Sequence, residues 1–389
     1  MHKVELSYLL TAQRGKDALI RNPLMDLLHA VREQGSISKA ASAMQLSYRH
    51  VWGALREWEQ TLGRGLIVWD KGQRARLTEF GEKLLWSERQ AQARLAPQIE
   101  TLRGDIERAF ASAFDDNTHV LTLFASHDAA LSALRDQTSQ HGLHLDIRFM
   151  GSVDAIAALN AGRCMMAGFH TQDLPSRHSL SAAAYRKLLK PGLHKLISFA
   201  QRSQGLIVAK NNPLRITGLA DIPSSQLRYV NRALGTGTRV LLDDLLRQAG
   251  IAAQDINGYA SQEPSHSAVA QAVASGAADV GLGIQAAAYE KGLGFIALTQ
   301  ERYHLVCLKS ELDSKPVQAL LSELQSQAWQ DTLQALPGYG GKPSQSNADI
   351  NTQSGKVLSL RATLPWWNYR VKKTNLKLSQ SQPQDLDPT

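Results

Sequence analysis

A change in hydrophobic period near residue 118 most strongly limits the folds open to this chain. From His119 onward, runs that fit strands alternate with runs that fit helices: HVLTLFASHD, AALSALRDQTSQHG, LHLDIRFMGS, VDAIAALNAGRC and MMAGFHT. Strands and helices at this spacing predict a parallel sheet with right-handed crossovers. The pattern resumes after about residue 195 and ends in the strands of ALTQERYHLVCLKSEL. We therefore expect an α/β protein with two lobes joined by crossing segments.

Helical spacing dominates the chain before that point. The stretch NPLMDLLHAVREQG (22–35) predicts a helix that begins near Pro23 and ends at Gly35. SKAASAM predicts a short helix and QLS a tight connection, in which Ser47 caps the following helix. The expected buried faces carry Leu24, Leu27, Leu28 and Val31 in the first helix and Val51, Leu55, Trp58 and Leu62 in the last. This order predicts an all-α helix-turn-helix domain, whose second helix enters the major groove of DNA.

Polar residues on and around that second helix are the candidate DNA contacts. LIVWDKGQRAR predicts a hairpin with a basic tip, a wing, followed by a helix that Thr78 caps. Arginine can bond guanine through two hydrogen bonds, and serine and tyrosine commonly hold phosphates. The candidates are Ser36, Ser47, Tyr48, Arg49, His50, Trp52, Arg56, Lys71 and Arg74. Lys and Arg outnumber Asp and Glu by four over residues 36–76, and the chain carries a net charge of +8, which favours a polyanionic partner.

These motifs resemble those of a known family. GSISKAASAMQLSYRHVWGALREWE followed by LTEFGEKLL resembles the winged helix-turn-helix of the molybdate-responsive ModE repressors and of the related LysR-type regulators, over roughly residues 20–90. The resemblance implies binding to double-stranded operator or promoter DNA. The wing DKGQRAR is short and lacks the glycine-rich run of ModE wings, and a module that binds protein is the alternative.

A long amphipathic helix is predicted over residues 82–114, with a kink at Pro97. Its apolar residues recur at three- and four-residue steps: Leu95, Ile99, Leu102, Ile106 and Phe110. In the regulators that this chain resembles, such a helix pairs with its twin and forms a homodimer or a higher homo-oligomer. Packing onto its own domain is the alternative.

Residues at the carboxyl ends of the predicted strands are the candidate ligand contacts, because open α/β sheets bind ligands at those ends. The stretch VNRALGTGTRVLLDDLL turns from a strand into a helix whose first amides are free to hold an anion. The candidates are Ser126, His127, Asp128, Ser152, His170, Arg202, Arg232, Thr236, Gly237, Thr238, Arg239, Ser265 and His266. A surface ion pair for Arg239, a helix cap for Ser152 and a structural role for His170 remain open.

The second half of the chain also resembles a known domain. MAGFH (166–170), RSQGLIVAKNNP (202–213) and SHSAVAQAVASGAADVGLG (265–283) resemble the PBP-like domain that is fused to ModE-type helix-turn-helix domains and to molybdopterin-biosynthesis proteins. The resemblance implies a periplasmic-binding-protein fold that senses a small anionic effector, with molybdate, tungstate or a molybdenum-cofactor-related ligand as the first expectation. The arginines leave a LysR-type regulator that senses an organic acid open. A third alternative is an anion- or cofactor-binding module that does not bind DNA.

Several classes are not expected. The chain has no apolar run of about 18 residues, and its first residues, MHKVELSYLLTAQRGKD, meet charges too soon for a secretory signal. Cys164 and Cys307 show no metal spacing, so we expect no metal and a reduced, cytoplasmic compartment. The run from Ser126 to Asp128 cannot form a catalytic triad, since adjacent side chains diverge. No enzyme motif is present, and we expect no enzymatic activity and no cofactor beyond the effector.

The expected domain organisation has four parts. A winged helix-turn-helix domain spans residues 1–81, a linker and dimerisation helix 82–117, a two-lobed PBP-like domain 118–336, and a C-terminal extension 337–389. In the extension, Trp366 and Trp367 are expected to pack on the second lobe, and LKLSQSQPQDLDPT is typical of a disordered end.

Overall fold

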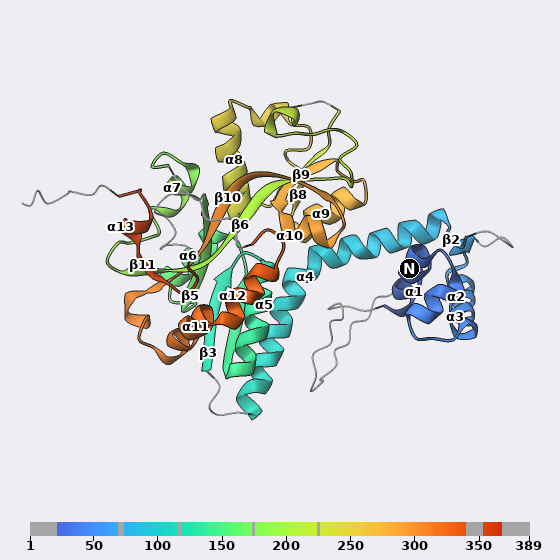
Figure 1. Ribbon diagram of the computed structural model, residues 1–389, viewed down its shortest axis with the longest axis horizontal. Helices are drawn as coiled ribbons and strands as arrows, with labels where there is room; N and C mark the ends of the chain where they lie inside the picture. The colour runs from blue at the N-terminus through green and yellow to red at the C-terminus, as the bar shows by residue number, and fades with distance from the viewer. Residues whose placement is uncertain are drawn as a thin grey trace, which may run out of the picture.

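A computed structural model describes residues 22–68, 74–114, 119–172, 176–223, 226–339 and 353–367. A small helical domain and a larger α/β domain are joined by one long helix, α4 (Glu79–Phe114) (Figure 1). The expected α/β class with an N-terminal helical domain is confirmed.

The N-terminal domain contains three helices and a two-stranded antiparallel ribbon. These are α1 (Pro23–Gln34), α2 (Ile37–Ala43), α3 (Tyr48–Leu62), β1 (Ile67–Val68) and β2 (Arg76–Leu77). Asn22 begins α1, because its Oδ1 accepts the Leu24 amide at 3.0 Å, and Gly35 ends it with a φ of +60°. Val51 and Leu55 of α3 lie in the same apolar cluster as the buried face of α1. The helix order and faces predicted from spacing are confirmed.

The linker helix α4 is 36 residues long and contains Pro97. Thr78 caps its start by accepting the Gly81 amide at 3.0 Å, as predicted. The helix changes direction where it reaches the larger domain (Figure 1). Proline inside a helix lacks the amide that would bond four residues back, and such positions kink helices.

Within the described residues, nine strands of the larger domain form one sheet, in the order β4-β3-β5-β10-β6-β9-β7-β8 with β11 beside β6. The first lobe contains β3 (His119–Ala125), α5 (Ala129–Thr138), β4 (Leu143–Phe149), α6 (Ser152–Asn160), β5 (Met166–Gln172), α7 (Leu180–Tyr185), α11 (Lys315–Gln325) and α12 (Gln327–Ala335). Strands β3, β4 and β5 are parallel, as the alternating pattern predicts.

The second lobe is built in the same way. It contains β7 (Tyr229–Arg232), α8 (Gly237–Ala249), β8 (Gln262–Glu263), α9 (His266–Ala274), β9 (Val280–Ile284) and α10 (Gln285–Glu290). Strand β7 runs parallel to both β8 and β9, so its carboxyl end and that of β8 share one edge of the sheet.

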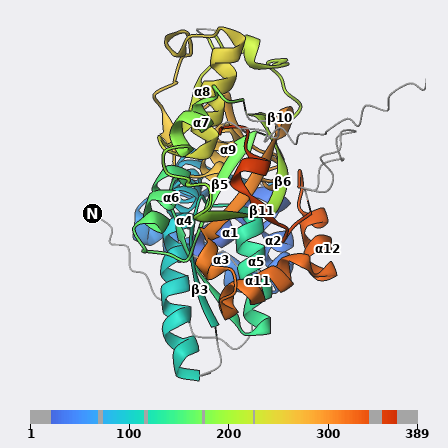
Figure 2. The same ribbon diagram turned by 90° about the vertical axis from the view of Figure 1, so that its left-hand side faces the viewer.

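Two 15-residue strands, β6 (His194–Val208) and β10 (Gly294–Leu308), pair with each other and run through both lobes. Figures 1 and 2 show α8 and α9 toward one end of these strands and α5 and α11 toward the other. The pairing shifts register between Ala297 and Thr299 and again between Tyr303 and His304. The irregular stretch lies midway between the lobes, beside the residues of the candidate site.

The C-terminal extension returns to the first lobe. Strand β11 (Val357–Ser359) pairs with β6, and the short helix α13 (Leu360–Thr363) follows. Trp366 is buried beside Tyr185 in the apolar cluster under α6. The expectation that the tryptophans pack on the second lobe is wrong, because β11 joins the part of β6 that lies in the first lobe. The sequence end expected to be disordered lies outside the described residues.

Candidate functional site

A cavity of about 400 Å³ lies between the two lobes and α4. Ser126 and His127, directly after β3, and Gly151, after β4, line it from the first lobe. Arg232, at the end of β7, and Thr236 line it from the second. The carboxyl strand ends of both lobes therefore meet at one site, as predicted.

The two lobes touch along one side of this cavity. A Cβ atom added to Gly151 would lie 2.7 Å from the carbonyl oxygen of Gly235, so no side chain fits there. A Cβ atom added to Gly237, the first residue of α8, would lie 3.3 Å from Ser152 Oγ, at the start of α6. The positive ends of two helices thus converge from opposite lobes, which favours a negative charge between them.

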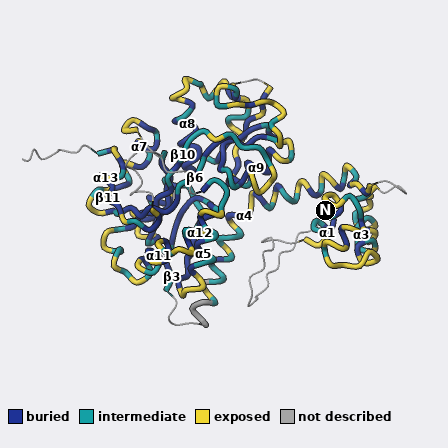
Figure 3. The backbone as a smooth tube through the Cα atoms, in the orientation of Figure 1, coloured by how far each residue is buried: buried dark blue, intermediate teal, exposed yellow. Residues whose placement is uncertain are grey.

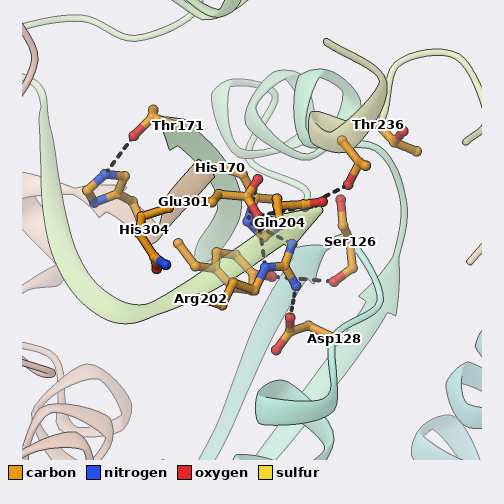
Figure 4. Close-up of polar contacts among 12 residues, drawn as sticks. Ser126, Asp128, His170, Thr171, Arg202, Gln204, Thr236, Glu301 and His304 are labelled. Carbon is orange, nitrogen blue, oxygen red and sulfur yellow. Dashed lines mark hydrogen bonds and ion pairs between the residues drawn. The ribbon is translucent and has the colours of Figure 1, made fainter. Parts of the chain in front are cut away.

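Arg202 is the centre of a buried ion network (Figure 4). Its Nε donates to Glu301 Oε2 at 2.8 Å, and its Nη1 donates to Asp128. The Tyr339 hydroxyl donates to the same carboxylate of Asp128 at 2.7 Å. Burial disfavours the charge of Arg202, but Glu301 and Asp128 outweigh that cost and raise its pKa well above the usual value. Arg202 and Asp128 are therefore committed to each other within the fold.

Gln204 extends this network into the second lobe. Its Nε2 donates to Glu301 Oε2 at 2.8 Å and to Thr238 Oγ1 at 3.1 Å. Thr238 Oγ1 lies 3.4 Å from His266 Nε2. Burial, reinforced by Arg232, lowers the pKa of His266 well below its usual value, so this imidazole is neutral at pH 7.

Two residues that line the cavity carry a buried polar atom without a hydrogen-bond partner among the residues that the structure describes, Ser126 Oγ and Arg232 Nε. The buried network beside them contains three more such atoms, His170 Nε2, Gln204 Oε1 and His266 Nδ1. Buried polar groups without partners are costly and uncommon in native proteins. Hydroxyl and N–H donors outnumber acceptors in this set, so the site suits a ligand rich in acceptor oxygens.

Arg232 is the cation that the fold leaves least compensated. It is 2% exposed, and its Nη1 donates to the backbone carbonyl of Glu263 at 3.1 Å. No carboxylate in the described part of the chain forms an ion pair with it. Burial, followed by the nearby charge of Arg202, lowers its pKa to about 9. An anion in the cavity would relieve both costs.

His170 packs against the ring of Tyr303 at 3.9 Å between centroids. Its Nδ1 lies 3.4 Å from Arg202 Nη2 and 3.7 Å from Glu301 Oε1. Its Nε2 has no hydrogen-bond partner among the described residues. Burial, followed by the charge of Arg202, lowers the pKa of His170 well below its usual value.

Other predicted ligand residues are occupied by the fold. Thr236 caps α8 by accepting the Arg239 amide at 3.3 Å, although it also lines the cavity. Arg239 Nε donates to Asp243 at 3.2 Å, and its guanidinium lies 4.2 Å from the ring centre of Tyr259. The expected alternative of an ion pair holds, but Arg239 is buried, so the pair is not on the surface. Ser265 caps α9 and donates to a carbonyl of α4, and His127 lies 3.4 Å from a carboxylate of α4.

The first turn of α3 presents the candidate DNA contacts. Tyr48, Arg49 and His50 are exposed, and much of the backbone tube around the α3 label is yellow, the colour of exposed residues, in Figure 3. Ser36 and Ser47 serve as helix caps, which orient α2 and α3.

The remaining candidates divide into three groups. Trp52 stacks with Tyr48 at 6.4 Å between centroids, and Arg56 lies 4.6 Å from the centre of the Trp52 ring and 3.0 Å from Glu59. Arg74 is exposed at the edge of the ribbon. Lys71 lies outside the described residues.

Sequence reasoning missed Gln204, Glu301 and Tyr339, which complete the buried network, and it missed the wall that α4 adds to the cavity. The signal for Glu301 was a carboxylate in the motif ERYHLVC of an otherwise apolar strand. The signal for the α4 wall was the proline inside a predicted helix.

The described residues contain no group of three or more His, Cys, Asp or Glu side chains placed to hold a metal ion. Among them, no helix combines the length and apolarity needed to cross a membrane.

Two family matches cover most of the described chain. Residues 24–82 match the bacterial regulatory helix-turn-helix proteins of the lysR family, and residues 133–325 match the PBP superfamily domain. The resemblance to LysR-type regulators and to PBP-like domains is confirmed, while the finer resemblance to ModE repressors stays a prediction.

Individual relatives are similar to parts of the chain. The protein YvgK of Bacillus subtilis is 33% identical over 195 residues, which span 50% of this chain and 62% of YvgK. An uncharacterised protein in the ferredoxin gene 5′ region of Clostridium pasteurianum is 36% identical over 101 residues, 26% of this chain and 89% of that protein.

Similar solved structures include full-length BenM, with a TM-score of 0.38 and 14% identity over 77% of this chain and 94% of that chain. A Corynebacterium glutamicum OxyR mutant bound to hydrogen peroxide has a TM-score of 0.41 and 18% identity, over 78% and 92% of the respective chains.

Proposed function

We infer the function of this chain from its two domains, since residues 24–82 match the helix-turn-helix of the lysR family of bacterial regulatory proteins and residues 133–325 match the PBP superfamily domain. It is a DNA-binding transcription regulator with a ligand-binding domain. We propose that its effector is a small anion, which binds in the cavity between the two lobes and changes how the recognition helices meet DNA. We propose the cytoplasm as its compartment, because a DNA-binding regulator acts there.

One observation carries the proposed anion. Donors from both lobes are buried around one cavity without partners in the described chain, and Arg232 is a buried cation without a carboxylate partner there. A ligand with acceptor oxygens would satisfy Ser126 and Arg232 together, since both line the cavity. Because these groups come from different lobes, such a ligand would also hold the lobes together.

A small carboxylate is the first candidate for this anion. Arg202 is held by Asp128 and Glu301, and Glu263 is paired with Arg94 of α4, so Arg232 is the buried cation of the cavity lining that has no carboxylate partner among the described residues. A carboxylate in the cavity would supply that partner. Arginine also binds carboxylates with favourable geometry.

Molybdate or tungstate is the second candidate. Neutral hydroxyl and imidazole donors, together with the converging starts of α6 and α8, are groups that hold tetrahedral oxyanions without a full opposite charge. A molybdenum-cofactor-related ligand would use the same donors for its oxyanion.

Calorimetric titration and thermal melting of the full chain test the effector class. The panel contains acetate, succinate, benzoate, formate, phosphate, sulfate, molybdate and tungstate. We expect one class to bind and to raise the melting temperature, and Ser126→Ala to weaken that binding about fivefold through loss of one hydrogen bond. Ser275→Ala is the matched control, because Ser275 Oγ bonds only within its own helix turn at Ala272. Absence of binding by every member would contradict an anion sensor of these classes.

We further propose that the protein is a homodimer or higher oligomer paired through α4. Three large apolar side chains of α4 remain exposed, namely Trp86, Leu95 and Leu102. The same helix packs on β4 and α9 of its own domain. Pairing with a twin helix and packing on its own domain are therefore compatible, because they use different faces of α4. Sedimentation of the full chain and of Leu95→Glu/Leu102→Glu tests this, and an unchanged mass in the variant would contradict pairing through these residues.

A further inference from the structure

We propose that α4 is itself a wall of the effector cavity and that Glu263 bridges it to Arg232, so the helix that carries the DNA-binding domain reads the effector directly. The inference rests on the proposed function, because it assigns the regulation of that same cavity. Four observations carry it: an ion pair to the second lobe, a docked carbonyl, an anchor on the first lobe and the cavity lining between them.

The first observation is the attachment of α4 to the second lobe through Glu263. Arg94 donates to its carboxylate from Nε at 2.9 Å and from Nη2 at 2.7 Å, and Gln90 Nε2 donates to Oε1 at 3.0 Å. The Glu263 side chain is 5% exposed. A bidentate pair between arginine and a buried carboxylate is a strong and directional contact, unlike an exposed ion pair.

The second observation is a docking point that Pro97 creates. Because Pro97 has no amide hydrogen, the carbonyl of Ala93, four residues earlier, loses its partner within the helix. Ser265 of the second lobe donates to that carbonyl at 3.1 Å and is fully buried. The kink in α4 and its contact with the second lobe therefore have one origin.

The third observation is the attachment of the same helix to the first lobe, two turns later. Glu100 accepts from the Ser132 hydroxyl at 3.0 Å and lies 3.4 Å from His127 Nε2. It also lies 3.7 Å from the buried guanidinium of Arg135. His127 lines the cavity, so this anchor also ends at the candidate site.

The fourth observation is what lies between the two anchors. Pro97, Gln98 and Thr101 line the cavity opposite Ser126 and Arg232. A ligand that fills the cavity is therefore in reach of all three surfaces: the first lobe, the second lobe and α4.

Glu263 connects the cavity to α4 through two of its own groups, the side-chain carboxylate and the backbone carbonyl. Its side chain is held by Arg94 and Gln90 of α4, while its backbone carbonyl accepts from Arg232 Nη1 at 3.1 Å. An anion that reorients Arg232 changes the bond to this carbonyl and with it the position of the carboxylate. Any change in the distance between the lobes must release one anchor or bend α4 at Pro97, and either event moves the DNA-binding domain.

The test compares Arg94→Gln with Arg228→Gln in the full chain. Arg228 is a matched control, because it also forms a two-bond pair with a second-lobe carboxylate, Asp279, and is 53% exposed against 54% for Arg94. Amide hydrogen exchange is measured without anion. We expect exchange of residues 88–98 and 262–268 to accelerate about tenfold in Arg94→Gln and to stay unchanged in Arg228→Gln.

The second readout is DNA affinity, by fluorescence anisotropy, with and without each anion of the titration panel. Arg94→Gln should keep anion affinity within about fivefold of the wild type and lose the anion-dependent change in DNA affinity, which Arg228→Gln should retain. Ser265→Ala should show the same loss in a weaker form. Unchanged exchange in Arg94→Gln, or a retained anion response, would overturn the bridge. A wild-type chain without any anion response would count against the proposed function, and the exchange measurement would still decide the bridge.

Discussion

The first turn of α3 and the cavity between the lobes are both rich in polar side chains, but they differ in what surrounds those side chains. Tyr48, Arg49 and His50 lie in solvent, and they are free to meet an extended charged surface. Ser126 and Arg232 are buried, and each carries a polar atom without a hydrogen-bond partner among the described residues. The first arrangement suits DNA, and the second suits a ligand small enough to be enclosed.

This difference has a consequence for substitutions. On α3, removing a side chain should change binding to a partner and leave folding alone. Around the cavity, the same removal acts on folding wherever the atom has a partner inside the protein, and on ligand binding wherever it has none. Arg202, which is held by two carboxylates, and Arg232, which bonds a backbone carbonyl but has no carboxylate partner among the described residues, allow the two effects to be compared within one site.

The largest effect is expected for Arg202→Met. The change leaves the carboxylates of Asp128 and Glu301 buried without their cation, which costs about 3–5 kcal/mol of unfolding free energy. Urea denaturation followed by tryptophan fluorescence measures this, and the melting temperature should fall by roughly 10 °C. Adding Asp128→Asn and Glu301→Gln should recover much of the loss. Equal stability of the single variant and the wild type would show that Arg202 is not the centre of the network.

The next effect separates binding from folding. Arg232→Gln removes the buried cation without a carboxylate partner, so anion affinity should fall about a hundredfold, which corresponds to roughly 2.7 kcal/mol. The melting temperature without anion should stay the same or rise, because an unfavourable buried charge is gone. Calorimetry and thermal melting of one preparation give both values. A fall in unfolding free energy as large as that of Arg202→Met would show that Arg232, like Arg202, acts mainly on folding.

The third prediction concerns how the unfolding free energy depends on pH through the buried histidine His304. His304 donates to or accepts from Thr171 at 3.2 Å, and burial lowers its pKa to about 3. The unfolded chain protonates this histidine near pH 6.5, so its contribution to stability is complete above that pH and is lost as the pH falls toward 3. Between pH 7 and pH 5 the loss should be about 2 kcal/mol.

Denaturation at several pH values checks this expectation. His304→Gln should reduce the slope of unfolding free energy against pH below 6.5, whereas His178→Gln, on the exposed surface, should leave it unchanged. Equal slopes in the wild type and in His304→Gln would mean that the imidazole is solvated in the folded protein.

The same contrast explains what the sequence predicts well. Helix α3, its cap Ser47 and its buried face follow from spacing and local hydrogen bonds, and the structure confirms them. The alternation of strands and helices after His119 likewise predicts the parallel strands β3 to β5. Each of these features depends on residues that are near in sequence.

The position of the cavity was predicted, but the hydrogen bonds around it were not, because they join residues that are far apart in the sequence. Strand ends can be located from the sequence, so Ser126, Arg232 and Thr236 were named as candidates and do line the cavity. Whether a candidate is free depends on partners far away in the chain. The bond from Arg202 to Glu301 spans 99 residues, and the bond from Ser265 to the carbonyl of Ala93 spans 172. No local pattern encodes such pairings.

The smallest effect is expected on the exposed side. Arg49→Ala removes a guanidinium for which the described residues offer no ion pair, so the unfolding free energy should change by less than about 0.5 kcal/mol. Specific DNA affinity should fall about tenfold, or roughly 1.4 kcal/mol, through loss of a base or phosphate contact.

Fluorescence anisotropy with a promoter fragment at several salt concentrations distinguishes the two kinds of contact. If Arg49 holds a phosphate, the slope of log affinity against log salt should fall by about one unit and all sequences should weaken alike. If it reads a base, the slope should change little and discrimination against mutated operators should drop. Arg163→Ala, on the exposed surface of the first lobe, is the control. If Arg49→Ala binds DNA as well as this control, the first turn of α3 is not the DNA-contacting surface. The exposed side chains compared here with the enclosed cavity would then have no role in DNA binding.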